Sequence, residues 1–294
     1  MSELPGPWPA RVAWAALPIT VGPVLGEALA ERSLSVARTG SALAWAVWVL
    51  GLLAVAVPRT ASLTTLRVVA PLVLPIAVWA ALAVDGGAAA VVALVWAALV
   101  LLAVLWPEVA ESFADGSSYG DERRMLLRTP TPLLLGPVPL AWVAAVAGPI
   151  AGLLLLAARQ WALGAVVLVV GGVVSRAAVR ALHGLARRWV VFVPAGLVLH
   201  DLQAMGDPVL FPRSSVAALG PATTVSAAAA GDGELCDLTL GTVGIALQLD
   251  LREPLEVAPR RGRQALDLVS TRHLRFAPAR PGAVLTEARR RRIG

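Results

Sequence analysis

Residues 88–107 of the chain read AAAVVALVWAALVLLAVLWP and contain no charged side chain. About 20 predominantly apolar residues are enough for a helix to cross the hydrocarbon layer of a bilayer, so this stretch predicts a transmembrane helix. Comparable stretches lie before and after it, punctuated by Pro, Gly or charged residues. We expect six spans, near residues 12–30, 41–58, 66–84, 88–107, 134–157 and 160–179.

The composition of the whole chain agrees with a membrane protein. Its 294 residues are 57% hydrophobic and 15% charged, with a mean hydropathy of +0.74, which is too apolar for a water-soluble protein of this length. Cys236 is the single cysteine, so the sequence excludes an internal disulfide and a cysteine metal cluster. No catalytic, metal or nucleotide motif stands out, and we expect no catalytic residues, no metal and no cofactor.

The expected spans group into three hairpins. The connections at residues 85–87 and 159–160 are so short that spans three and four, and five and six, must run antiparallel. Spans one, three and five contain proline, whereas the interiors of the other three do not: Pro18, Pro23, Pro71, Pro75, Pro137, Pro139 and Pro149. Proline frees a carbonyl that a neighbour must satisfy, so we expect these helices inside the bundle or lining a cavity. An internal repeat of the hairpins is left open.

Arginine placement predicts the orientation. With both termini in the cytoplasm, ten Arg lie on the inner side, namely Arg11, Arg59, Arg67, Arg123, Arg124, Arg128, Arg176, Arg180, Arg187 and Arg188, against Arg32, Arg38 and Arg159 outside. We therefore expect a multi-pass protein of the cell (inner) membrane. The run ending Ala28-Leu29-Ala30 also resembles a cleavable signal peptide, which would leave five spans; we favour a retained first helix.

The longest connection, residues 108–133, is rich in charge. A tight turn at residues 116–120 could bring acidic side chains together for a divalent cation, with Arg side chains for a phosphate, from the set Asp115, Tyr119, Asp121, Glu122, Arg123 and Arg124. No general base such as His lies within the loop. We favour a solvated loop whose acids pair with its own Arg side chains.

From residue 187 the pattern changes to short alternating segments. Strands are expected over residues 189–193, 197–200, 208–211, 215–219, 235–240, 244–250 and 265–271, followed by a helix over 282–292. The sequence thus predicts a helical membrane domain, 1–186, and a small mostly-β cytoplasmic domain, 187–294. His200 beside Asp201 could act as a base, but a histidine at the end of a strand is the simpler interpretation.

Net charge points to lipid as a partner. Residues 187–294 contain 14 Arg against 10 Asp and Glu, and four of those Arg are the final run. A neutral body with a basic end beside a bilayer favours anionic headgroups over nucleic acid. The expected lipid-binding residues are Arg187, Arg188, Arg289, Arg290, Arg291 and Arg292.

Membrane hairpins followed by RRWVVFVPAGLVLH (187–200) and VLFPRSSVAAL (209–219) carry a resemblance. The final third resembles the bacterial pleckstrin-homology-like (PH-like) domains attached to membrane spans, and the whole is similar to uncharacterised multi-pass proteins of actinobacteria. The resemblance implies a small barrel or bent sheet that binds protein or lipid.

Three functions remain open. The first is a membrane scaffold or regulator whose cytoplasmic domain binds a protein partner or anionic lipid. The second is a transporter or flippase that moves a lipid or apolar solute along the proline-kinked helices, with a cavity between spans one, three and five. The third is a metal-dependent membrane transferase that uses the acidic loop over 108–124. The first leads, because it requires no residue that the chain lacks.

Overall fold

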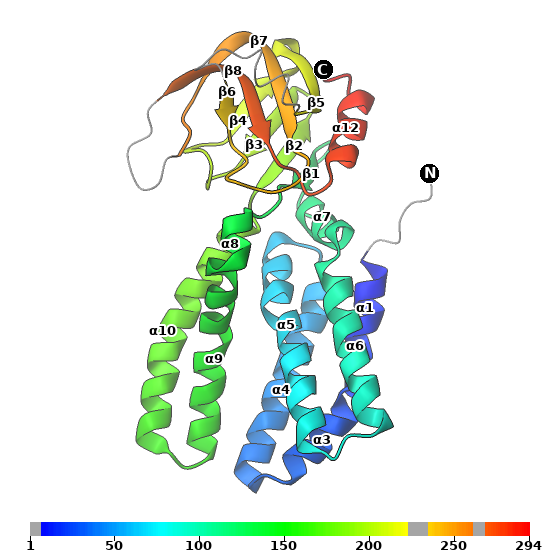
Figure 1. Ribbon diagram of the computed structural model, residues 1–294, viewed down its shortest axis with the longest axis vertical. Helices are drawn as coiled ribbons and strands as arrows, with labels where there is room; N and C mark the ends of the chain where they lie inside the picture. The colour runs from blue at the N-terminus through cyan, green and yellow to red at the C-terminus, as the bar shows by residue number, and fades with distance from the viewer. Residues whose placement is uncertain (1–6, 223–234, 261–267) are drawn as a thin grey trace. The chain divides into compact units, whose positions relative to one another are not determined.

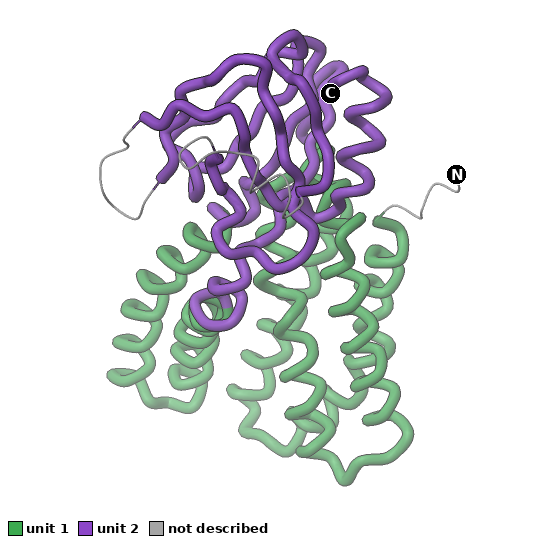
Figure 2. The backbone as a smooth tube through the Cα atoms, turned by 45° about the horizontal axis from the view of Figure 1, so that its top comes forward, with its two compact units in different colours: residues 1–116, 139–183 green, residues 117–138, 184–294 purple. Residues whose placement is uncertain are grey.

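A computed structural model describes residues 7–222, 235–260 and 268–294 (Figure 1). The chain forms two compact units, coloured separately in Figure 2. The helical unit comprises Met1–Gly116 and Pro139–His183, and the β-rich unit comprises Ser117–Val138 and Gly184–Gly294. The predicted division into domains 1–186 and 187–294 stays a prediction.

Five helices in the described part of the chain are long and apolar enough to cross a membrane, as expected of a multi-pass membrane protein. They are α4 (Leu34–Ala56), α5 (Thr60–Ala83), α6 (Ala88–Leu105), α9 (Pro137–Ala157) and α10 (Trp161–Leu185). The short connections at residues 84–87 and 158–160 fold α5 with α6, and α9 with α10, into hairpins (Figure 1).

The expected first span is not one continuous helix. Residues 8–30 form three short helices, α1 (Trp8–Ala15), α2 (Leu17–Thr20) and α3 (Gly22–Ala30). The described residues therefore contain five helices of membrane length, and a sixth span over residues 12–30 stays a prediction. The breaks have a local cause, because Pro18 and Pro23 each take the second position of the following helix. Proline has no N–H for the preceding turn but fits the first turn of a new helix.

The broken segment still packs closely. Ala10, Trp14, Val24 and Ala28 are buried; α1 lies against α4 and α6, and α3 lies against α4, α5 and α6. In the α9–α10 hairpin, glycines allow close approach, because a Cβ at Gly148 would overlap the backbone of Gly171. Small residues that let backbones meet are the usual basis of helix packing in membranes.

Neighbouring helices satisfy the carbonyls that proline leaves without a partner. In α9, Pro149 cannot donate to the carbonyl of Ala145, and the Ser175 hydroxyl on α10 donates to it at 2.5 Å. Pro18 likewise leaves the Trp14 carbonyl, which accepts a hydrogen bond from Trp48 Nε1 on α4 at 3.2 Å. At Pro149 and Pro18, a side chain of a neighbouring helix thus replaces the donor that proline lacks.

The residues between α6 and α9 are not one solvated loop. They form the helix α7 (Pro107–Asp115), the strand β1 (Arg123–Leu126) and the short helix α8 (Thr131–Leu135). On α7, Val109, Phe113 and Ala114 are buried, and the helix packs against α5 and α6 within the helical unit. The expected loop is therefore largely regular structure, because its sparse apolar residues fall on one face of a helix.

The β-rich unit contains two four-stranded sheets and a C-terminal helix. The first sheet is antiparallel in the order β1, β2 (Trp189–Val193), β3 (Gly196–His200) and β4 (Val209–Pro212). The second has the order β5 (Val216–Pro221), β7 (Leu247–Val257), β8 (Val269–Phe276) and β6 (Leu235–Asp237), with β6 parallel to β8. The short 3-10 helix η1 (Arg213–Ser215) joins β4 to β5. Of the strand expected over 265–271, residues 265–267 lie outside the described residues.

One apolar core lies between these elements. It includes Phe192, Phe211, Leu247 and Phe276 from the sheets and Val284 from α12 (Pro281–Arg290). Along β7, Leu247, Leu249 and Leu251 face this core while Gln248 and Asp250 lie on the opposite face, as the period of two in a strand requires. The prediction of strands followed by a final helix is confirmed.

The first sheet is assembled across a membrane hairpin. β1 precedes α9 and α10 in the chain and β2 follows them, yet the two strands pair directly, with Leu126 opposite Trp189. The α9–α10 hairpin is thus an insertion between two adjacent strands of the sheet. Both ends of the hairpin connect to the same end of this strand pair.

Candidate functional site

The helical unit contains an apolar cavity of about 310 Å³. The first three helices, α4 and α5 line it, with Trp14, Leu25, Trp45, Trp48 and Ile76 among the side chains. Pockets lined mainly by apolar and aromatic groups are typical of ligand sites. Glu27, an acidic residue within α3, is exposed and does not line the cavity.

Two tryptophans shape one wall of the cavity. Trp14 Nε1 donates to the Trp48 carbonyl at 2.9 Å while Trp48 Nε1 donates to the Trp14 carbonyl. A Cβ at Gly51 would overlap the Trp14 ring, so glycine is needed where the ring crosses α4. The cavity differs from the predicted one, because α4 and not the fifth expected span forms the third wall.

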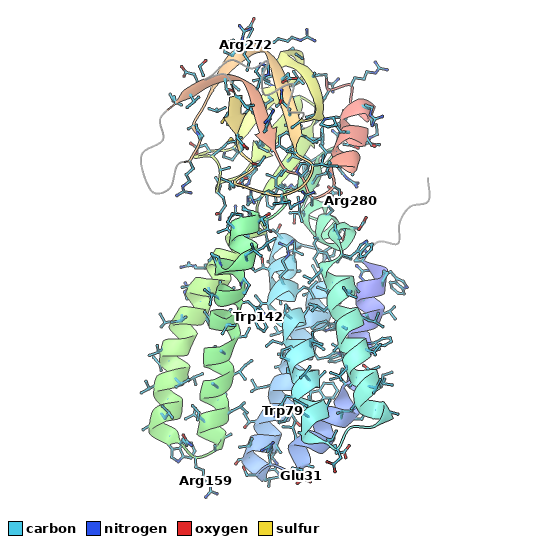
Figure 3. All side chains as sticks on the ribbon, in the orientation of Figure 1. Glu31, Trp79, Trp142, Arg159, Arg272 and Arg280 are labelled. Atoms are coloured by element: carbon cyan, nitrogen blue, oxygen red, sulfur yellow. The ribbon has the colours of Figure 1, made fainter. Side chains whose placement is uncertain are left out.

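Tryptophan also links α9 to the rest of the helical unit. Trp142, labelled in Figure 3, lies against α5 and its Nε1 donates to the carbonyl of Val68 at 2.9 Å. Val68 lies three residues before Pro71, where the proline ring disturbs the helix ladder. Trp142 therefore anchors the hairpin to the kinked helix without lining the cavity.

The basic C-terminal run is the end of a packed helix and not a free tail. Glu287 accepts hydrogen bonds from Arg290 Nη2 at 2.7 Å and Arg291 Nε at 2.5 Å, and Arg291 Nη2 donates to the Asp121 carbonyl at 2.6 Å. Burial by itself raises the pKa of the Glu287 carboxyl, but the hydrogen bonds and charges of Arg290 and Arg291 outweigh burial and lower the pKa.

The four arginines of this run therefore differ in availability. The Arg291 guanidinium is engaged on two sides within the β-rich unit. Arg289, Arg290 and Arg292 are exposed, and 67% of the Arg290 side chain is accessible although it pairs with Glu287. The exposed three are the part of the run that can meet a headgroup or an acidic partner.

Arg188 is removed from the predicted lipid-binding set. Its guanidinium donates to both carboxylate oxygens of Asp201, at 2.8 and 2.7 Å, and to the Arg128 carbonyl at 2.9 Å. The Arg188 and Asp201 side chains are 3% and 0% exposed. The neighbouring Arg187 is exposed, and lipid binding by Arg187 stays a prediction. The pattern of two adjacent arginines could not distinguish these positions.

The predicted loop site is divided among different elements. Asp115 ends α7 in the helical unit, whereas Tyr119 to Arg124 belong to the β-rich unit. Within the β-rich unit, Glu122 pairs with Arg124 at 3.2 Å, and the Arg124 guanidinium lies 5.4 Å from the Trp189 ring centroid. Tyr119, Asp121 and Arg123 are exposed. A shared role for the six residues stays a prediction.

Histidine does not form the acid–base pair that neighbouring positions in the sequence suggested. His200 stacks on Trp189, with ring centroids 5.0 Å apart, and its Nδ1 lies 3.0 Å from the Arg187 carbonyl. Asp201 is held by Arg188 instead. The structural interpretation of His200 as a strand-end residue agrees with these contacts.

A second histidine belongs to a polar cluster that the sequence analysis missed. His273 Nδ1 lies 2.7 Å from Asp250 Oδ1, which also accepts from Gln248 Nε2 at 2.8 Å, and Gln248 Oε1 accepts from Arg275 Nε at 3.2 Å. The residues pair across β7 and β8, with Asp250 opposite His273 and Gln248 opposite Arg275. The sequence shows that β7 and β8 each have a polar face, but only the register of the two strands brings these four side chains together.

The described residues, 7–222, 235–260 and 268–294, contain no group of three or more His, Cys, Asp or Glu placed to hold a metal ion. Comparison with protein-family models, with curated proteins and with solved structures finds no match for the chain. What the fold itself defines is a multi-pass membrane protein with five candidate spans and a β-rich unit that ends in a helix.

Proposed function

We propose that the chain is a scaffold or regulator of the cell membrane, with both termini in the cytoplasm. Its β-rich unit, PH-like in the sense of the sequence resemblance, binds a protein partner or anionic lipid. The observation that supports this proposal is the pairing of β1 with β2 on either side of the α9–α10 hairpin. A binding unit built in this way is tied to the membrane at two neighbouring strands.

This double connection favours regulation over simple anchoring. A single flexible linker would let a binding domain move independently of the membrane helices. Here only residues 127–130 separate β1 from α8, and residues 186–188 separate α10 from β2. A displacement of the hairpin ends would act directly on the β1–β2 pair, and partner binding would act back on the hairpin.

The basic end of α12 supplies the binding surface in this proposal. Arg289, Arg290 and Arg292 are exposed on a helix end that the core and Glu287 hold in place. Each Arg near an anionic leaflet contributes about 1 kcal/mol to membrane attraction. The arginine bias between the two sides of the membrane supports placing this surface in the cytoplasm.

Substitutions in the full chain test the role of this basic surface. Removal of the residues after Arg188 would not, because it would leave β1 without its partner strand β2. The full chain with Arg289→Glu and Arg292→Glu is compared with the unaltered chain after crosslinking in native membranes and mass spectrometry. We expect specific proteins or anionic lipids to be lost from the variant. Arg252→Glu with Arg272→Glu is the matched control, since both residues are exposed on the second sheet. Equal retention by all three chains would sink the proposal.

The cavity favours a second candidate, a transporter or flippase for a lipid or apolar solute. Its walls include two of the three proline-containing expected spans, and its surface is mainly apolar. Leu25→Trp would fill the cavity, whereas Leu50→Trp on α4 adds the same bulk at an exposed position outside it. Transport predicts loss of lipid or solute movement in reconstituted vesicles for the first variant alone.

A further inference from the structure

Residues 239–245 form a loop between β6 and β7 with an apolar tip. Val243 is 73% exposed and Ile245 is 62% exposed, separated by Gly244. Single exposed hydrophobic residues are common, but two of them on either side of a glycine in one loop form an apolar projection that a contact partner can cover.

The loop is fastened to the residues that lead into a membrane helix. Arg128 Nη1 donates to the Val243 carbonyl at 2.7 Å, and the Val243 N–H donates to Thr131 Oγ1 at 2.9 Å. Thr131 begins α8, and α9 begins at Pro137, two residues after α8 ends. The loop, α8 and the first two residues of α9 all belong to the β-rich unit, so within this unit the loop is bonded to the segment that leads directly into α9.

Apolar side chains continue along α8. Leu135 is 82% exposed, and Leu134 is exposed beside it. Exposed apolar side chains thus occur both on α8 and on the loop, two segments that the bond from Val243 to Thr131 joins. Because α9 enters the hydrocarbon layer immediately after α8, a lipid surface is the partner that is necessarily adjacent.

Several backbone groups of the loop form hydrogen bonds within the protein. Thr242 donates through its N–H to the Thr239 carbonyl at 3.1 Å and through its hydroxyl to the same carbonyl. The Thr239 N–H donates to Asp237 Oδ1 at 2.8 Å. Backbone groups that enter the membrane need internal partners, and both polar groups of Val243 have them.

Glycine permits this arrangement at one position. Gly244 has φ of +112°, and a Cβ there would overlap the Arg128 guanidinium. Any other residue would be strained and would displace the arginine from the loop. The Arg128 guanidinium therefore lies beside Val243 and Gly244. A cation next to apolar side chains can pair with lipid phosphates while the apolar groups enter the bilayer.

From these observations we infer that residues 239–245, together with α8, insert their apolar side chains into the interfacial region of the bilayer beside the start of α9. The inference depends on the membrane position of α9 and not on partner recruitment. The loop is an interfacial anchor that holds the second sheet at the membrane surface. It adds a third attachment to the two strand connections of the β-rich unit.

Site-directed fluorescence tests the inference in the full chain. A polarity-sensitive dye is attached to Val243→Cys or Ile245→Cys, with Cys236→Ala removing the native thiol, in nanodiscs of phosphatidylcholine and phosphatidylglycerol. We expect several-fold stronger quenching by acyl-chain nitroxide lipids than at Ser214→Cys, together with protection from iodide. Ser214 is the control because it is exposed near the opposite end of the first sheet, where Pro212 pairs with Gly196. Quenching equal to that at Ser214→Cys would overturn the inference.

A second measurement needs no label. In the full chain, Val243→Asp with Ile245→Asp should leave thermal unfolding in detergent unchanged, since both side chains are exposed. In nanodiscs the pair should raise amide hydrogen exchange across residues 239–246 several-fold, because carboxylates leave the interface. Unchanged exchange in a folded variant would count against insertion.

Discussion

Trp14 and Trp48 exchange hydrogen bonds between their indole N–H groups and each other's backbone carbonyls, at 2.9 and 3.2 Å. Because Pro18 cannot donate to the Trp14 carbonyl, the Trp48 indole replaces the missing helical bond. In the same way, the Ser175 hydroxyl donates to the Ala145 carbonyl, which Pro149 leaves without a helical donor. Membrane helices thus keep their prolines by pairing with a donor on a neighbouring helix.

Trp48→Phe removes that donor and is expected to destabilise the helical unit by about 1 kcal/mol. Pro18→Ala in the same chain should recover much of the loss, since residue 18 then has an N–H for the Trp14 carbonyl. Thermal unfolding in detergent measures both. Trp45→Phe is the control, because Trp45 is more than half exposed. No recovery in the double variant would contradict this account.

Gly171→Ala is expected to destabilise the α9–α10 hairpin by about 1–3 kcal/mol, because the new methyl group meets the Gly148 backbone. Gly172→Ala is matched in chemistry and has open space around the added Cβ. It should be neutral or slightly stabilising, since Ala favours a helix. Equal effects at the two positions, measured by denaturant titration in micelles, would show that the glycine contact is unimportant.

Arg188→Met leaves the Asp201 carboxylate buried without its cation, and we expect a loss of about 3–5 kcal/mol in the stability of the β-rich unit. Arg187→Met, at an exposed position, should stay within about 0.5 kcal/mol of the unaltered chain. Adding Asp201→Leu to Arg188→Met should restore part of the stability, because no buried charge remains. Amide hydrogen exchange of β2 and β3, measured by mass spectrometry over a denaturant series, follows the stability of this unit separately from the helical unit.

Glu287 predicts a pH dependence of stability. Its folded pKa is lowered by Arg290 and Arg291, so its ionised form stabilises the fold above the unfolded pKa and the contribution is lost as pH falls through the folded pKa. Glu287→Gln should therefore reduce the melting temperature at pH 7 and have progressively less effect towards acid pH. Glu256→Gln, an exposed position on β7, should show no such trend. A Glu287→Gln effect that is constant with pH would refute the linkage.

Local patterns were enough for much of the fold. The hydropathy of residues 88–107 predicts α6 to within two residues, and the alternation around residues 189–200 predicts the β2–β3 hairpin. Such signals depend only on nearby side chains and the period of the element. The first span shows the limit, because the sum of apolar residues over 12–30 concealed two breaks at prolines.

The candidate sites were less predictable, since charge alone does not reveal burial. Arg187 and Arg188 are adjacent arginines, but one is exposed and the other is enclosed with Asp201. The His273 and Asp250 pair depends on the register of β7 and β8. Ile245 was expected in the strand over 244–250 and Val243 just before it, and only the hydrogen bonds of Val243 to Arg128 and Thr131 relate this loop to the segment that leads into α9.

By itself the sequence determined that this is a multi-pass membrane protein followed by a β-rich region and a final helix, because hydropathy and periodicity act over a few turns of chain. Only the tertiary structure decided that β1 pairs with β2 across the α9–α10 hairpin. RRML at residues 123–126 is too short to predict as a strand, and its stability comes from a partner more than sixty residues away. Pairing of that kind is decided by the shared core, which no local pattern specifies.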